Sequence, residues 1–379
     1  MSNPNSTLNY PAPKPTSAGS PGALGKQVAS AAFTTSRKLP APLIYGFFVG
    51  ALVISGLIFW LVTAAADNSF NWVGWILIAL IIYVAATLTA SKVVEGSRHC
   101  RARFWKIFIY GAFILALIPL VSVIWSVLGA GIARLDAEFF TNSMRNVVGE
   151  GGGALHAIIG TVEITLMATV ISVPIGLMTA IYLVEYGRNW IAKALTFLVD
   201  VMTGIPSIVA GLFSYALFLM ILGPGQQMGF AGSIALSVLM IPVVVRSTEE
   251  MLRLVPNELR EAALALGVPR WKMIVKIVLP TSMAGITTGV MLAISRVIGE
   301  TAPLLVTVGL TQSMNYNLFD GSMMTMPVFV YNSYMNQGAD AQAYIDRAWA
   351  GALTLILIVM LLNLIARLVA RYFAPKGMR

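Results

Sequence analysis

The sequence contains few charged residues. Only 11% of its 379 residues are Asp, Glu, Lys or Arg, whereas 58% are hydrophobic and the mean hydropathy is +0.80. Soluble domains carry about 25% charged residues, so this composition excludes a cytosolic enzyme, a secreted domain and a disordered regulator. One water-soluble core could not bury this much apolar surface. The composition therefore predicts a polytopic membrane protein.

Cysteine and histidine are also scarce. Cys100 is the single cysteine, which excludes an internal disulfide. The two histidines, His99 and His156, stand apart from other metal-ligating residues, so we expect no metal site and no cofactor. The sequence also has no phosphate-binding lysine loop and no hydrolase constellation. We therefore expect that the chain is not an enzyme and has no catalytic residues.

The apolar residues are arranged in long runs. These runs are far too long for barrel strands, and lipid offers no partner for unpaired backbone groups, so the expected elements are helices. We predict an all-α, polytopic membrane helical bundle of about eight transmembrane helices. The predicted spans are 42–65, 72–91, 106–133, 156–184, 195–222, 230–248, 282–309 and 348–373.

Two segments differ from these spans in composition. Residues 1–40 are rich in Pro, Ser, Gly, Ala and Asn, and we expect a disordered cytoplasmic tail. Residues 311–347 separate the last two spans and are polar and rich in Met and Asn. We expect short helices at the membrane surface there, for example around Met326 to Met335.

Lysine and arginine are unevenly distributed among the predicted loops. With the amino terminus inside, nearly all of them lie on the inner side, which is the usual bias of membrane proteins. The outer side then receives only Arg134, Arg145 and Arg347, and Arg296 lies within a span. We therefore predict that both termini are cytoplasmic.

The seventh predicted span contains a charged pair. Arg296 lies near the middle of this span, where a charge costs about 2.5–3.5 kcal/mol, and Glu300 lies four residues further on. One interpretation is an internal ion pair that only fixes helix packing. The other is a water-lined path for an anion, because guanidinium donates paired hydrogen bonds to phosphate-like or carboxylate-like oxygens. Pro303 predicts a kink beside the pair.

Other polar positions within spans give weaker signals. Glu163, in the fourth span, is interpreted as structural. Asp200 and Arg246 lie near predicted inner ends of spans, and they are less certain candidates for a path. Pro206 falls inside the fifth span, where it loosens the helix or permits close packing.

The longest inner loop, 249–280, is amphipathic. Asn257 is a candidate cap for a short helix, whose residues Leu259, Ala262, Ala263 and Leu266 fall on one side. Gly267 is expected to end this helix, with Pro269 two residues later. The loop either docks a partner protein or simply lies on the lipid surface.

The same loop carries a family motif. Its spacing resembles the EAA loop of ABC importer permeases at Glu261, Ala262, Ala263, Gly267, Ile277, Leu279 and Pro280. Further stretches resemble the phosphate-specific permeases of this family: IYLVEYGR (181–188), PSIVAGLF (206–213), LVPNELREAALALGVPRWKM (254–273), GETAPLL (299–305) and RAWAG (347–351). The resemblance covers roughly residues 105–375.

The resemblance implies an architecture and a role. A permease domain is expected at 105–375, and an additional transmembrane hairpin with a basic inner loop at 41–104. The expected role is that of the permease subunit of an ATP-driven phosphate importer in the cell membrane, with Arg296, Glu300 and Thr301 along the path. Expected partners are a homologous second permease, two ATP-binding subunits docked on 249–280, an extracytoplasmic phosphate-binding protein, phosphate and lipid, but no nucleic acid.

Two alternatives remain at this point. A permease for another oxyanion would keep the EAA loop and change the lining of the seventh span. A secondary transporter or a membrane scaffold would need no ATPase partner.

Overall fold

The chain is helical wherever its structure is described. A computed structural model describes residues 39–66, 71–187, 189–338 and 340–373, and these contain helices and no strands. This result confirms the predicted all-α class. Nearly all of the predicted tail, 1–40, lies outside the described residues. The structure separates into two compact units, Met1–Leu120 and Val121–Arg379. The division into a hairpin at 41–104 and a permease domain at 105–375 stays a prediction.

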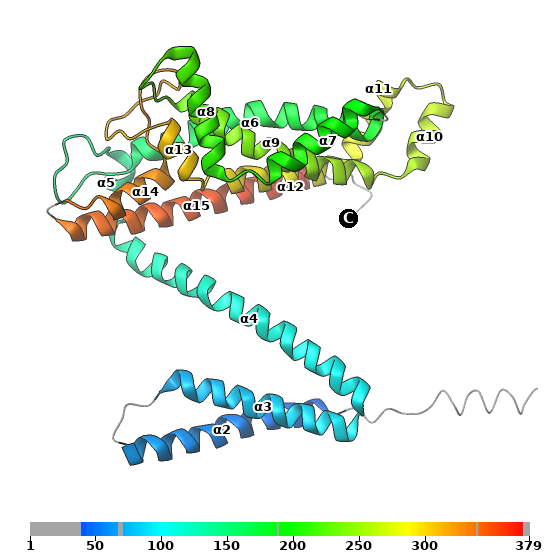
Figure 1. Cartoon of the computed structure of the whole chain (residues 1–379), viewed down its shortest axis with the longest axis vertical. Helices are drawn as coiled ribbons and strands as arrows, with labels where there is room; N and C mark the ends of the chain where they lie inside the picture. The colour runs from blue at the N-terminus through cyan, green and yellow to red at the C-terminus, as the bar shows by residue number, and fades with distance from the viewer. Residues whose placement is uncertain (1–38, 67–70, 188, 339, 374–379) are drawn as a thin grey trace, which may run out of the picture. The chain divides into compact units, whose positions relative to one another are not determined.

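The first unit contains a helical hairpin. Helices α2 (Ala41–Ala66) and α3 (Trp72–Val94) pack side by side, and the indole nitrogen of Trp75 donates to the Leu52 carbonyl at 3.1 Å (Figure 1). Helix α4 (Ser97–Gly131) begins directly after α3. The turn between α3 and α4 carries Glu95, whose buried carboxylate accepts hydrogen bonds from Ser91, Arg103 and the Leu39 amide.

The second unit is built around α9 (Gly229–Arg253), which is the most buried of the described candidate spans. Helix α6 (Leu155–Ile181) packs along α9 through small residues, and a Cβ added at Gly176 would lie 2.7 Å from the Val244 side chain. The hydroxyls of Ser233 and Ser237 donate to α6 carbonyls. Small and hydroxylated side chains permit this close packing between apolar helices.

Seven described helices, or helical runs, are long and apolar enough to cross a membrane, which agrees with the predicted number of about eight. The predicted fifth span is different. In place of one helix over 195–222, the chain forms α7 (Trp190–Thr203) and α8 (Ser207–Leu222), which are bent by 110° at the break. Pro206 caps α8, and its ring cannot continue the α7 hydrogen-bond pattern. The prediction of one continuous helix over 195–222 was therefore wrong.

The predicted seventh span is also interrupted. Helix α12 (Leu279–Val297) ends inside the predicted range of 282–309, and the short helix α13 (Ala302–Thr307) follows after a four-residue break. Pro303 stands in the first turn of α13, so the kink predicted beside the charged residues is present as a break. Helix α13 packs against α8 and α9.

The segment between α13 and the last helix is partly helical. Helix α14 (Met326–Met335) confirms the short helix expected there, although one side of it is buried against α6 and α15 (Ala341–Phe373). The Met326 amide donates to the Thr161 hydroxyl of α6 at 2.7 Å. The short helix α5 (Ala137–Thr141) lies at the same end of this unit, opposite α10 (Asn257–Ala265) (Figure 1).

Candidate translocation and coupling sites

The break between α12 and α13 presents the predicted path residues. Arg296 is the next-to-last residue of α12, and its side chain is exposed on the isolated chain. Glu300 and Thr301 follow in the break, and both are half-buried. The three residues therefore lie together at an interruption of the helix. Interrupted backbone at membrane depth is tolerated where it is enclosed by protein or lines a polar cavity.

The structure does not form the predicted ion pair. No ion pair joins Arg296 to Glu300 among the described residues. The prediction assumed a continuous helix, in which residues four apart share a face. Because α12 ends at Val297, Glu300 leaves that helical register and its amide bonds to the Val297 carbonyl.

Ser295, which precedes Arg296, contacts an asparagine of α15, Asn363, that the sequence analysis missed. The hydroxyl of Ser295 donates to the Asn363 side-chain oxygen at 3.2 Å, which joins α12 to α15. The Asn363 amide also donates to the Val359 carbonyl in its own helix. An asparagine within an apolar span is a signal that could have identified this position.

The 249–280 loop forms the predicted short helix. Helix α10 ends before Gly267, which adopts φ +76° in the left-handed region favoured by glycine. Helix α11 (Arg270–Met273) and the π-helical segment η3 (Ile274–Val278) then lead into α12. The predicted cap was wrong: Pro256 occupies the N-cap position, and Asn257 is the first helical residue, whose side-chain oxygen accepts from Arg260.

The apolar side of α10 is largely uncovered. Ala263 is buried, but the other three residues predicted to share its face are exposed, including Leu266 at 84%. Nearby Trp271 is also 63% exposed. Of the remaining EAA positions, Glu261, Gly267 and Pro280 are exposed, whereas Ile277 and Leu279 are half-buried. The loop thus presents an apolar surface that the described part of the chain leaves uncovered.

Arg260 fastens α10 to the rest of the unit. Its guanidinium bonds to the Glu185 carboxylate at 3.0 Å and to the carbonyls of Leu252 and Val255. Glu185 belongs to η2 (Tyr182–Tyr186), a π-helical segment that continues α6. Both charged side chains are largely buried, at 13% and 8% exposure. This contact positions the loop against the end of α6.

Asp200 and Arg246, the less certain path candidates, are paired. The Arg246 guanidinium bonds to Asp200 of α7 and, at 3.0 Å, to Glu249 one turn further along α9. Arg253 bonds to the other oxygen of Glu249 at 2.6 Å. A cavity of about 410 Å³ is lined by Asp200, Glu249 and Arg253 among others. The cluster links the carboxyl-terminal parts of α7 and α9.

Two further polar residues lie in α6. His156 is buried with its ring edge-on to Phe329, and Glu163 is half-buried. In the part of the chain that the structure describes, no group of three His, Cys, Asp or Glu residues is placed to hold a metal ion.

Comparisons with known proteins agree with this arrangement. Residues 172–378 match the family model of the binding-protein-dependent transport system inner membrane component. The permease of a bacterial alginate ABC transporter has a similar fold, with a TM-score of 0.52 at 16% identity over 73% of this chain and 97% of that one.

Curated relatives are more similar in sequence. The phosphate transport system permease protein PstA 1 of Mycobacterium tuberculosis is 48% identical over 72% of this chain and 88% of its own length. PstA of Yersinia pestis is 39% identical over 77% and 96%, respectively. The chain therefore belongs to the family of binding-protein-dependent transport system inner membrane components, and within it to the group of permeases named PstA.

Proposed function

We propose that this chain is the permease subunit of an ATP-driven phosphate importer. The observation that carries the proposal is the 39–48% identity to phosphate transport permeases over most of the chain. The exposed Arg296 at an interrupted span supports it chemically. A phosphate ion cannot enter hydrocarbon without its hydration water, so the path must offer compensating polar and positive groups.

The proposed path contains Arg296, Glu300 and Thr301. Arg296 is exposed on the isolated chain, so a homologous second permease packed on this side would enclose it. Its guanidinium offers two parallel donors to phosphate oxygens. Glu300 forms no ion pair with Arg296 among the described residues, and its negative charge near the path favours release of the anion. Asp200 and Arg246 are satisfied by each other and by Glu249, which supports a role in packing at the inner end.

The energy is proposed to come from partner subunits. ATP hydrolysis takes place on two ATP-binding subunits, and this chain carries no catalysis of its own. They dock on the 249–280 loop, where the exposed side chains of Leu266 and Trp271 offer an apolar surface for binding. An extracytoplasmic phosphate-binding protein delivers the anion. The complex lies in the inner or plasma membrane with both termini of this chain in the cytoplasm, as the distribution of Lys and Arg predicts.

Reconstituted uptake tests the proposal. The complete complex is placed in liposomes with the binding protein, and ATP-dependent entry of radiolabelled phosphate is measured. We expect Arg296→Ala to lower the rate about tenfold or more, which corresponds to ~1.4 kcal/mol. Arg296→Lys should fall in between, because it keeps the charge and loses the planar fork. Arg98→Ala, which removes an exposed arginine of α4, is the matched control. Unchanged uptake by a normally assembled Arg296→Ala complex would remove this residue from the path.

Two measurements separate the alternatives. Competition by excess sulfate against labelled phosphate distinguishes a phosphate permease from one for another oxyanion. Co-purification of the ATP-binding subunits distinguishes an importer from a secondary transporter or scaffold. We expect Glu261→Ala or Gly267→Val to reduce that co-purification; full retention by both variants would contradict docking at this loop.

A further inference from the structure

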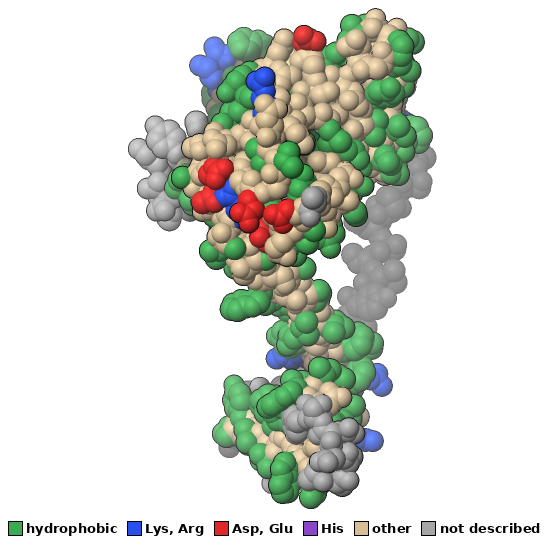
Figure 2. All heavy atoms as spheres, turned by 90° about the vertical axis from the view of Figure 1, so that its left-hand side faces the viewer, with side chains coloured by type: hydrophobic (Ala, Val, Ile, Leu, Met, Phe, Trp, Pro, Cys, Tyr) green, Lys and Arg blue, Asp and Glu red, His purple; other side chains and the backbone are tan. Residues whose placement is uncertain are grey.

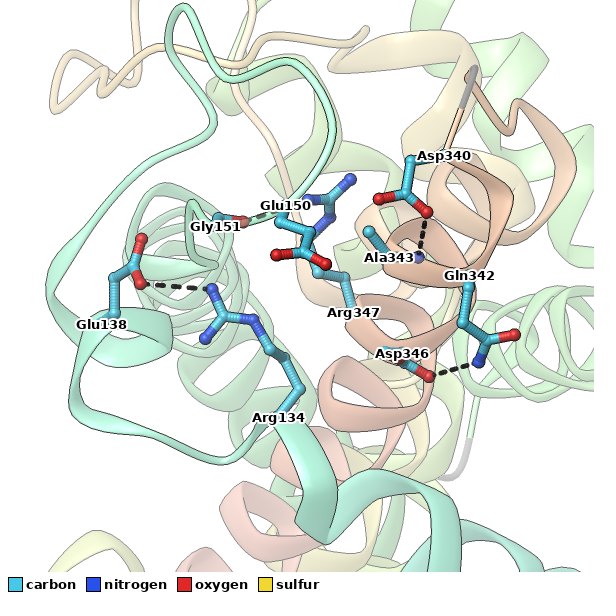
Figure 3. Close-up of a pocket in the computed structure, with 9 residues that line it drawn as sticks. All are labelled: Arg134, Glu138, Glu150, Gly151, Asp340, Gln342, Ala343, Asp346 and Arg347. Atoms are coloured by element: carbon cyan, nitrogen blue, oxygen red, sulfur yellow. Dashed lines mark hydrogen bonds and ion pairs between the residues drawn. The ribbon is translucent and has the colours of Figure 1, made fainter.

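The end of the second unit that carries α5 lies opposite α10 (Figure 1), and a polar pocket opens there (Figure 3). Its volume is about 380 Å³. The lining comes from three places: the segment around α5, the glycine-rich loop at 149–153, and the first turns of α15. Both of its arginines, Arg134 and Arg347, are predicted to lie on the outer side of the membrane. The pocket therefore faces away from the ATPase-coupling loop.

Arg347 forms the floor of this pocket. Only 1% of the residue is exposed, and one guanidinium nitrogen, Nη1, donates to the Gly149 and Gly151 carbonyls at 2.7 and 3.0 Å. The guanidinium also lies over the Tyr344 ring, 4.4 Å from its centre. The other two nitrogens, Nε and Nη2, have no hydrogen-bond partner among the residues that the structure describes. A buried donor without an acceptor is costly, so this group favours an arriving oxygen.

Carboxylates surround the arginine. Glu138 pairs with Arg134, but Glu150, Asp340 and Asp346 form no ion pair among the described residues (Figure 3). Asp340 accepts from the Ala343 amide and Asp346 from the Gln342 side chain, which fixes both at the start of α15. Acidic side chains gather on this face of the molecule (Figure 2). With four carboxylates and two guanidinium groups, the pocket is net negative.

The unpaired carboxylates and the unpaired Arg347 donors together indicate which kind of group binds in the pocket. The net negative charge disfavours a free anion, including phosphate. The carboxylates are also not placed as a metal site, since no metal-binding group is found among the described residues. A basic side chain on a polypeptide satisfies both features, because its cation pairs with the carboxylates and a nearby backbone carbonyl accepts from Arg347.

We propose that this pocket receives a lysine or arginine side chain of the extracytoplasmic binding protein. The inference rests on the proposed function and adds the place and chemistry of that contact. Two observations favour this occupant: the matched family depends on a binding protein, and the charge of the pocket is complementary to a basic side chain. The cation lies between Glu150, Asp340 and Asp346.

Binding of the purified phosphate-binding protein to the complete complex in nanodiscs tests the proposal. The triple variant Glu150→Gln/Asp340→Asn/Asp346→Asn removes the three unpaired charges and preserves side-chain size. We expect the Kd to rise tenfold or more and its dependence on salt concentration to weaken. Asp320→Asn, which neutralises an exposed acid outside the pocket, should leave the Kd unchanged.

A second measurement locates the contact. Zero-length carbodiimide coupling joins a carboxylate to a lysine only when they touch, and mass spectrometry of the product should report Glu150, Asp340 or Asp346. An unchanged Kd in the triple variant, or no binding by the wild-type complex, would overturn the proposal. Uptake of phosphate by the wild-type complex is measured separately, so failure of the proposed function would be recognised independently of failure at this pocket.

Discussion

Glu185 and Arg260 form a largely buried ion pair that joins the π-helical end of α6 to the short helix α10 at 3.0 Å. The two residues are separated by three helices in the chain, α7, α8 and α9, and their contact fixes the loop that carries the EAA spacing. The pair therefore connects α10 directly to the end of a helical run, Leu155–Tyr186, that is long and apolar enough to cross a membrane.

Breaking this pair should uncouple the loop. We expect Arg260→Ala to destabilise the protein by about 3–5 kcal/mol, because it leaves the Glu185 carboxylate buried without a partner. Thermal unfolding of the purified chain measures the change. In the double variant with Glu185→Gln the loss should be less than additive. Glu258→Gln, an exposed acid in the same helix, is the control, and an equal loss in that variant would contradict the assignment.

The close approach of α8 and α13 requires glycine. A Cβ added at Gly211 would lie 2.6 Å from the Cα of Pro303, which is a backbone atom and cannot move alone. We expect Gly211→Ala to destabilise the protein by about 1–3 kcal/mol and to lower uptake, because α13 is displaced beside Arg296. Gly129→Ala is the control, since an added Cβ there meets no atom within 4 Å. Wild-type stability of the Gly211 variant would show that α8 and α13 lie further apart.

Substitutions of Arg246 and Asp200, which pair with each other, should lower the stability of the protein by different amounts. Arg246→Ala removes bonds to both Asp200 and Glu249, and we expect a loss of about 1.5–3 kcal/mol. Asp200→Asn removes one pairing at a more exposed carboxylate and should cost less. Thermal unfolding ranks the two variants. If uptake fell sharply in Asp200→Asn at unchanged stability, the cluster would belong to the path.

The first unit should lose stability in acid. Burial raises the pKa of Glu95, but hydrogen bonds from Ser91, Leu39 and Arg103 outweigh it and hold the pKa below its ordinary value of 4.5. The folded state therefore binds the proton less readily than the unfolded state, so the contribution of Glu95 is full above this value and is lost as the pH falls below it. Melting temperatures at about pH 7 and pH 4 should differ less in Glu95→Gln than in the wild type.

The sequence predicted helices wherever the local pattern decided the structure. The apolar run that forms α9 and the turn at Gly267 depend on hydropathy and on a single residue's backbone preference. Hydropathy could not separate α7 from α8, because the residues on both sides of Pro206 are predominantly apolar. A proline within a span is compatible with a kink or a full bend, and packing of α8 against α13 decides between them.

Side-chain partners were harder to predict than elements. Four-residue spacing suggested that Arg296 and Glu300 pair, but that argument fails once the helix ends between them. Arg347 was predicted only as an outer charge, whereas the glycine-rich loop 149–153 folds over it. Such burial depends on residues almost two hundred positions apart. Asn363 was overlooked for the same reason, since its partner Ser295 lies on another helix.

The π-helical segments η2 and η3 connect the 249–280 loop to two long helices. η2 ends α6, to which Arg260 attaches the loop, and η3 leads from the loop into α12. A π turn holds an extra residue compared with an α turn. Restoring ordinary α geometry at either place would rotate the adjoining backbone by about 100° around its axis. The loop is therefore connected to α6 through η2 and to α12 through η3. A change from π to α hydrogen bonding in either segment would rotate the long helix attached to it.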